Sequence, residues 1–155
     1  MLVKEALTFR PCLAVDLIFI ARLSSDAFAE YTTKAVSQTL DVVSRHATWV
    51  ALRGQESVGF VTVGKDGDVA VLHALAVVRS ERGKGVGFRL MQLFERFARE
   101  QSVRRLELCA AECNLAALDL FYRRGFRLVH RRERYYERGQ NACLLMKDLE
   151  IQAGF

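Results

Sequence analysis

The sequence has only one proline, which indicates few loops, and its lack of long apolar segments and of regularly spaced cysteines excludes two classes of protein. A membrane-spanning helix needs about 20 consecutive apolar residues. The nearest candidate, from Val15 to Leu23, is interrupted by Asp16 and Arg22. The N-terminus also lacks the charged, apolar and small-residue series of a secretion signal. We therefore expect a cytoplasmic protein that has no membrane partner.

The cysteines are spaced wrongly for a zinc finger. No two of them form a Cys-x-x-Cys pair, and the histidines stand far from them in the sequence. Zinc fingers and disulfide frameworks both depend on such regular spacing. Because free cysteine often behaves as a small core residue, we expect reduced and mostly buried thiols, and no metal site. The four cysteines are Cys12, Cys109, Cys113 and Cys143.

The chain does have the composition of a globular domain. Of its 155 residues, 51% are hydrophobic and 26% are charged, a balance that can bury one substantial core and excludes a disordered chain. We therefore expect a single domain over residues 1–155. The formal net charge of +5 suits an anionic partner. Charge alone does not distinguish nucleic acid, an acidic protein surface and a phosphorylated cofactor.

The apolar pattern alternates between helical and extended segments and predicts a mixed α/β domain. The clearest helix is 85–101, where apolar residues share one face and charged residues the other. The segment 69–78 is apolar on both faces, which is typical of a central strand. We expect about seven strands in a mixed, mostly antiparallel sheet, with about four helices. The expected strands are 7–10, 48–53, 57–63, 69–78, 103–110, 126–131 and 141–148, and the other helices are 13–28, 36–46 and 114–124.

A glycine-rich turn joins the central strand directly to the clearest helix. Glycines at 83, 85 and 87 remove side chains where the backbone must approach a ligand closely. The first N–H groups of the helix have no intrahelical partner, and Arg82 and Lys84 add positive charge beside them. This pattern is typical of an anion site, although a tight turn without a ligand uses the same residues. It is neither a Walker A loop nor a dinucleotide fingerprint.

Two motifs, in this order and at this spacing, resemble the GNAT superfamily of N-acyltransferases. They read Arg82-x-x-Gly85-x-Gly87 and Asn114-x-x-Ala117 followed by Gly125-Phe126. The resemblance covers nearly the whole chain and is weakest before Thr48. It implies a single-domain fold with a splayed central strand pair, and acetyl-CoA as the acyl donor.

The resemblance also implies how acetyl-CoA is held. In that family the backbone amides of the turn bind the pyrophosphate, and the strand before the turn pairs with the pantetheine arm. Asn114 matches an asparagine beside the pantetheine, although it also suits a plain helix cap. The implied cofactor residues are Leu75, Ala76, Val77, Arg82, Gly83, Lys84, Gly85, Val86, Gly87 and Asn114.

Acyl transfer to an amine needs a proton acceptor, because a protonated amine has a pKa of about 10. Our candidate base is His73, which stands where many relatives place a glutamate facing the acceptor site. The alternative is a histidine with its bonds satisfied inside an apolar strand. Glu107, on the next strand, is the second candidate for the base.

The position of the general acid departs from the family pattern. Relatives usually carry a tyrosine where this chain has Phe121, and Tyr122 follows one step later, turned by about 100° on a regular helix. We expect Tyr122 to act if the helix is locally irregular; otherwise another tyrosine or water serves. Direct attack needs no acyl-enzyme, so we expect Cys109 to be a small buried thiol rather than a nucleophile.

The C-terminal segment resembles the hairpin of protein N-terminal acetyltransferases, including the bacterial enzyme for a ribosomal protein. There, paired tyrosines like Tyr135 and Tyr136 flank the first residues of the peptide, although the pair also suits aromatic cover for an edge hairpin. Asn141 replaces the usual aspartate, and Cys109 replaces a base on the neighbouring strand. Tyr31, in the loop after the first helix, is expected to help to select the acceptor.

The acceptor itself stays open between a small-molecule amine, a lysine and a protein N-terminus. A non-catalytic acyl-CoA sensor is the main alternative, supported by Phe121 in place of the usual acid. The arginine-rich C-terminal part raises RNA contact as a third class, but specific RNA binding would normally add stacking aromatics on a sheet face. We therefore expect no nucleic-acid partner, and a homodimer is compatible with the family.

Overall fold

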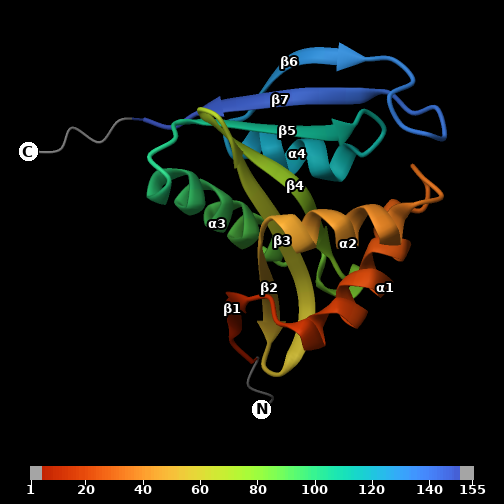
Figure 1. The fold of residues 1–155 in the computed structure, drawn as a ribbon, viewed down its shortest axis with the longest axis vertical. Coiled ribbons are helices and arrows are strands. Elements are labelled where there is room, and N and C mark those ends of the chain that lie inside the picture. The colour runs from red at the N-terminus through yellow and green to blue at the C-terminus, as the bar shows by residue number, and fades with distance from the viewer. Residues whose placement is uncertain (1–4, 151–155) are drawn as a thin grey trace, which may run out of the picture.

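The protein is represented by a computed structural model, in which residues 5–150 are described. Its strands form one sheet in the order β1-β2-β3-β4-β5-β7-β6 (Figure 1). Every neighbouring pair is antiparallel except β4 and β5, so the predicted mixed, mostly antiparallel sheet is confirmed. The strands are β1 (Leu7–Pro11), β2 (Ala47–Arg53), β3 (Glu56–Asp66), β4 (Val69–Val77), β5 (Arg105–Ala111), β6 (Arg127–Arg132) and β7 (Ala142–Asp148).

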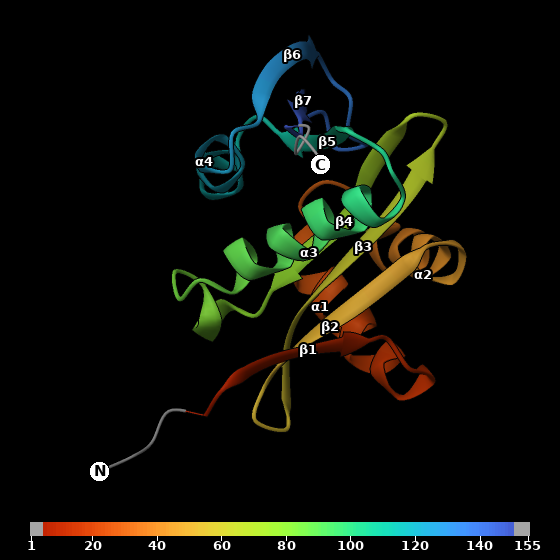
Figure 2. The same cartoon turned by 90° about the vertical axis from the view of Figure 1, so that its left-hand side faces the viewer.

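Helices cover both faces of the sheet. Over residues 5–150, the α-helices are α1 (Leu17–Phe28), α2 (Ala35–Arg45), α3 (Val86–Glu100) and α4 (Leu115–Arg123), with short 3-10 turns η1 (Ala14–Asp16) and η2 (Arg79–Glu81). Helices α3 and α4 pack on one face, and α1 and α2 pack on the other (Figures 1 and 2). None of the described helices is long and apolar enough to cross a bilayer.

The core follows the predicted helical stripe of α3. Val86, Leu90 and Phe94 are at most 1% exposed and pack against β3, β4 and β5. A smaller cluster on the opposite face joins α1 to β3 and β4 through Ile20, Phe60 and Ala76. Strand β4 is thus covered on both sides, which explains why its residues are mostly apolar on both faces.

The first predicted helix begins later than its apolar pattern indicated. Leu13 and Leu17 are 55% and 40% exposed, so they do not extend the buried stripe. The buried carboxylate of Asp16 accepts a hydrogen bond from the Leu13 N–H at 2.8 Å and forms an ion pair with Arg10 at 2.6 Å. These bonds hold residues 14–16 in a 3-10 turn, and the regular helix starts only after it.

Strands β4 and β5 separate after a short parallel stretch. Residues 69–72 of β4 pair with 105–108 of β5, and beyond this point β4 continues along β3 while β5 continues along β7. The two strands diverge visibly in Figure 1. The splayed central pair that the resemblance implied is therefore confirmed.

A bulge in β4 lies where this separation begins. Thr62 of β3 pairs with Ala74, and the next residue, Val63, pairs with Leu72. His73 is therefore left without a partner on β3. Such bulges redirect a side chain relative to its neighbours, and here they redirect the residue predicted as the base.

Candidate active site

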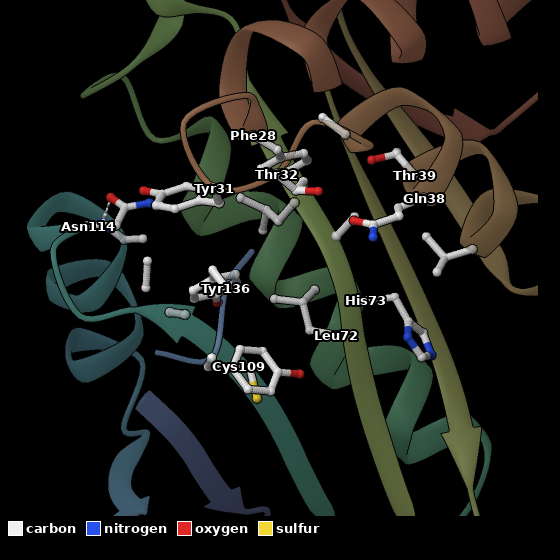
Figure 3. A pocket seen from close by; sticks show the side chains of 18 of the residues that line it. Phe28, Tyr31, Thr32, Gln38, Thr39, Leu72, His73, Cys109, Asn114 and Tyr136 are labelled. Atoms are coloured by element: carbon white, nitrogen blue, oxygen red, sulfur yellow. Dashed lines mark hydrogen bonds between the residues drawn. The ribbon is translucent and has the colours of Figure 1, made fainter. Parts of the chain in front are cut away.

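A cavity of about 500 Å³ lies where β4 and β5 separate (Figure 3). Residues 72–75 of β4 and 109–111 of β5 form one side of it, and α4 contributes Phe121. The segment from α1 to α2 and the loop between β6 and β7 complete the lining, the latter with Tyr135 and Tyr136. Four separate parts of the chain thus meet around one space.

His73 lines this cavity and stacks on a second histidine. Its ring lies 3.9 Å from that of His46, with 15° between the ring planes. Gly64 makes room for the stack, because a Cβ there would lie 2.6 Å from His46 Nδ1 and 2.9 Å from His73 Nε2. Partial burial, and then the charge of His46, lower the pKa of His73 below 6.5. Its imidazole is therefore neutral at neutral pH and able to accept a proton.

Three tyrosines line the cavity on the side of the two loops. The ring centroids of Tyr31 and Tyr136 are 5.2 Å apart, and Tyr135 meets Tyr136 edge to face at 5.1 Å. Tyr31 is buried, whereas Tyr135 is 47% exposed. Burial raises the pKa of both Tyr31 and Tyr136, so their hydroxyl groups remain protonated and can donate hydrogen bonds.

Cys109 also lines the cavity, and it is not the buried thiol that the sequence predicted. Along β5, Leu108 and Ala110 face the core, so Cys109 points to the opposite, open side. Cys113 is exposed as well, and among the four free cysteines only Cys143 is fully buried. Desolvation in the cavity wall raises the pKa of Cys109, which keeps it a thiol rather than a nucleophilic thiolate.

The glycine-rich turn lies between β4 and α3, and its geometry fits the pyrophosphate of CoA. Gly83 and Gly85 adopt φ values of 75° and 86°, and a Cβ on either would meet nothing within 4 Å. Helix α3 starts without a side-chain cap, so its first N–H groups are free to bind an anion. Lys84 borders a neighbouring hollow that Arg53 and Arg89 also line.

Asn114 caps α4 and lines the cavity at the same time. Its Oδ1 accepts a hydrogen bond from the Ala117 N–H at 3.2 Å, which confirms the cap. Its contact with the pantetheine arm stays a prediction. Gly125 then ends α4 with φ of 89°, as the sequence indicated.

The structure brings some of the predicted catalytic residues into the cavity and leaves others out. Helix α4 is regular, so Phe121 faces the cavity and is 5% exposed, whereas Tyr122 is 46% exposed and does not line it. Glu107, the second candidate for the base, does not line it either. The predicted residues that do line it are Tyr31, His73, Leu75, Asn114, Tyr135 and Tyr136.

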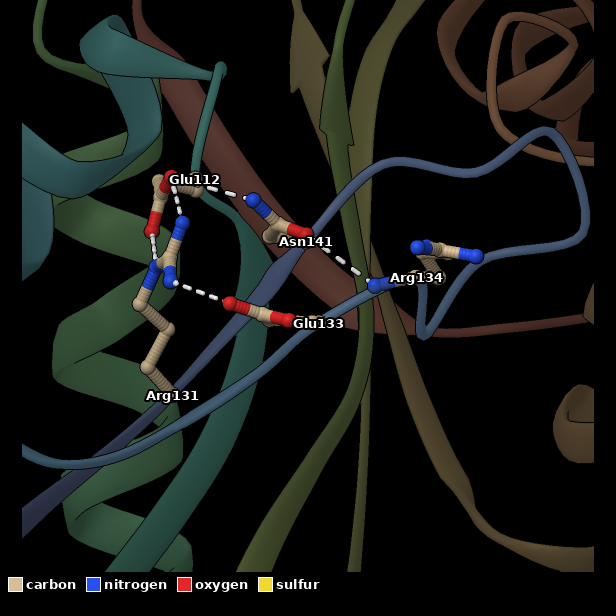
Figure 4. A network of polar contacts seen from close by, with 5 residues as sticks. All are labelled: Glu112, Arg131, Glu133, Arg134 and Asn141. Atoms are coloured by element: carbon tan, nitrogen blue, oxygen red, sulfur yellow. Dashed lines mark hydrogen bonds and ion pairs between the residues drawn. The ribbon is translucent and has the colours of Figure 1, made fainter.

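A polar network holds the base of the β6–β7 loop (Figure 4). Arg131 on β6 donates two hydrogen bonds to Glu112, which follows β5, and these bonds lower the pKa of Glu112. Asn141 donates to the same carboxylate at 3.3 Å and accepts from the Arg134 N–H at 3.0 Å. The residue that replaces the family's usual aspartate thus connects the loop to β5.

Sequence reasoning missed the contribution of Glu137. This residue lines the cavity and accepts hydrogen bonds from Thr32 and Thr33. The partners are more than 100 positions apart in the chain, so no local pattern could have indicated the contact.

The chain matches one protein-family model and resembles several solved structures. Residues 17–126 match the model of the acetyltransferase (GNAT) family. The structure of Ard1 from Thermoplasma volcanium is 26% identical, with a TM-score of 0.84 over 94% of this chain and 99% of that one. The ribosomal-protein-S18-alanine N-acetyltransferase of Escherichia coli is 19% identical, with a TM-score of 0.81 over 96% and 97%. Arabidopsis thaliana NAA60 with a bisubstrate analogue is 21% identical, with a TM-score of 0.80 over 94% and 99%. No curated protein sequence matches the chain.

Proposed function

Because the chain belongs to the GNAT acetyltransferase family and is thus an acetyl-CoA-dependent acetyltransferase, we propose that its acceptor is the α-amine of a peptide or protein N-terminus. The observation that carries this proposal is the set of tyrosines around the cavity. Tyr31, Tyr135 and Tyr136 all line the cavity beside the splayed strands, and Tyr135 and Tyr136 belong to the hairpin where the resemblance puts contacts with the first residues of a peptide. The likeness to the S18-alanine enzyme supports the same acceptor class.

We assign the donor site to the glycine-rich turn and to β4. The turn amides and Lys84 bind the CoA phosphates, and the backbone of residues 75–77 pairs with the pantetheine arm. Acetyl-CoA supplies an activated acetyl thioester. Asn114, at the cavity end of α4, orients the arm.

Two residues of the cavity handle protons in this proposal. The neutral imidazole of His73 accepts the proton that the acceptor amine must lose before it attacks. The Tyr136 hydroxyl, kept protonated by burial, would donate a proton to the CoA thiolate that leaves when the amine displaces it from the acetyl group. Tyr136 takes the role that the sequence predicted for Tyr122, because the regular helix turns Tyr122 out of the cavity.

The acceptor class is tested by following thiol release from acetyl-CoA with matched amines. Two sets of peptides share the same sequences, each with one internal lysine. The first set has a free α-amine and the second has a formylated one, and spermidine is the third probe. We expect release only with the free peptides. Equal release with the formylated peptides or with spermidine would move the acceptor to a lysine or to a small amine. Binding of acetyl-CoA without release from any acceptor would instead support a sensor.

A further inference from the structure

Two loops from opposite ends of the chain meet at the cavity. One is the α1–α2 loop, residues 29–34, and the other is the β6–β7 loop, residues 133–141. Thr32 donates a hydrogen bond to one carboxylate oxygen of Glu137 at 2.8 Å, and Thr33 donates to the other at 2.6 Å. We call these two bonds the latch. Thr32 and Glu137 both line the cavity, so the latch lies at its edge.

Further contacts join the same two loops beside the latch. The Arg138 N–H donates to the carbonyl oxygen of Tyr31 at 3.1 Å, and its Nε donates to that of Ala29 at 2.8 Å. Gln140 Nε2 donates to the carbonyl oxygen of Glu30 at 2.6 Å. The two loops therefore form one bridge along the cavity. Among the described residues, the two latch bonds are the only hydrogen bonds of this bridge that join one side chain to another.

We propose that the latch determines acceptor specificity by setting how far the bridge opens over the cavity. With the latch closed, the bridge leaves room for a slender terminal amine with a small first side chain. With the latch released, the tip of the β6–β7 loop moves away and a bulky first side chain also enters. This inference rests on the proposed peptide acceptor.

The tip of the loop is held separately from its base. The base is fixed by the network of Glu112, Arg131 and Asn141, which does not include the latch. Loss of the latch therefore loosens the tip, which the bonds of Arg138 and Gln140 still join to the α1–α2 loop, while β6 and β7 stay paired. The two hydroxyl donors lower the pKa of Glu137, so its carboxylate stays ionised and the latch stays closed at neutral pH.

The test uses a Thr32→Val, Thr33→Val double variant, which removes both donors and keeps the shape of each side chain. The matched control is Glu133→Gln, a carboxylate in the same loop that contacts Arg131 rather than the latch. Amide hydrogen exchange is measured over residues 29–34 and 136–140. We expect exchange in both segments to be up to about 25-fold faster in the double variant, about fivefold for each of the two lost hydrogen bonds, and unchanged in the control.

The second readout is acceptor preference, measured as kcat/KM for a peptide that begins with Phe divided by that for one that begins with Ala. The ratio should rise by about fivefold or more in the double variant and should stay constant in Glu133→Gln. Unchanged exchange would overturn the latch, and faster exchange with an unchanged ratio would overturn its role in specificity. If the wild type acetylates no peptide, the proposed acceptor fails, and the exchange result alone decides whether the latch closes the bridge.

Discussion

His73 combines three features that suit a base: a position in a β-bulge, a place in the cavity wall and a lowered pKa. The bulge gives the side chain a direction that regular pairing with β3 would not. The stack with His46 then holds the ring, and the charge of a protonated His46 opposes protonation of its neighbour.

The pH profile follows from the protonation state of His73. A base acts in its neutral form, so kcat/KM should fall as the pH decreases through the pKa of His73, with a midpoint below 6.5. His73→Gln should lower kcat/KM by about a hundredfold and should remove this acidic limb. Profiles of kcat/KM from pH 5 to 9 check this prediction. The control is His130→Gln, which changes an exposed histidine. Activity within a few-fold of wild type across that range would exclude His73 as the base.

The acid is tested with two substitutions that each remove a single hydroxyl group. Tyr136→Phe should lower kcat by at least about tenfold, because it removes the proposed proton donor from a residue of the cavity wall while the ring keeps its packing. Tyr122→Phe should stay within about twofold of wild type, because its side chain does not line the cavity. Steady-state kinetics with one acceptor peptide measure both variants. The reverse result would restore Tyr122 as the acid.

At this scale the sequence predicted some site residues and could not predict others. His73 and the tyrosine pair, which line the cavity, could be singled out because each occupies a matched position on a strand or hairpin, and their roles stay predictions. Whether Phe121 or Tyr122 faced the cavity depended on the regularity of α4, which residue types alone do not report. The stack of His46 on His73 depends on the missing side chain at Gly64, which is distant from His46 in sequence.

The turn between β4 and α3 is the element to which we assign donor binding. Its two left-handed glycines hold the backbone in a conformation that other residues adopt at a cost of about 1–2 kcal/mol. The space around them is open, so a methyl group there introduces backbone strain without a collision.

Gly85→Ala should therefore raise the Kd of acetyl-CoA by about tenfold, because the turn relaxes and the ligand has to restore it. Gly67→Ala is the matched control, since Gly67 also has a positive φ in open space but lies in the β3–β4 turn. Both variants should lose about 1 kcal/mol of unfolding free energy. Calorimetric titration should show weaker binding only for Gly85→Ala. Equal Kd values for the two variants would contradict the assignment of the phosphate site.

Elements with a strong local signal were predicted closely. Helix α3, the β2–β3 hairpin and the end of α4 at Gly125 agree with the sequence within a few residues. The predicted start of α1 was wrong, because Asp16 bonds to Arg10 and to the Leu13 N–H. These bonds keep the helix from extending back to Leu13. Tertiary contacts of this kind override periodicity.

On the scale of the whole molecule, a buried ion-pair network connects elements that are distant in sequence. Glu95 of α3 is 2% exposed and accepts hydrogen bonds from Arg124, at the end of α4, and from Lys147 of β7. Lys147 also donates to the carbonyl oxygen of Arg124. The network joins both helices of one face to the sheet.

Glu95→Ala should lower the unfolding free energy by about 3 kcal/mol, because it leaves two partly buried cations without their shared partner. Glu100→Ala, on the same helix, removes only an exposed pair with Arg96 and should cost less than about 0.5 kcal/mol. Urea denaturation of the two variants measures the difference. Similar midpoints would mean that the network adds little to stability.

The position of β7 between β5 and β6 matters while the protein is being synthesised. The ribosome releases β6 before β7, yet among the described strands β6 pairs only with β7. Until residues 142–148 emerge, β6 and the loop that carries Tyr136 therefore have no sheet to join. The glycine-rich turn and α3 have left the ribosome by then. The acceptor side of the cavity is therefore complete only after β7 has been inserted between β5 and β6.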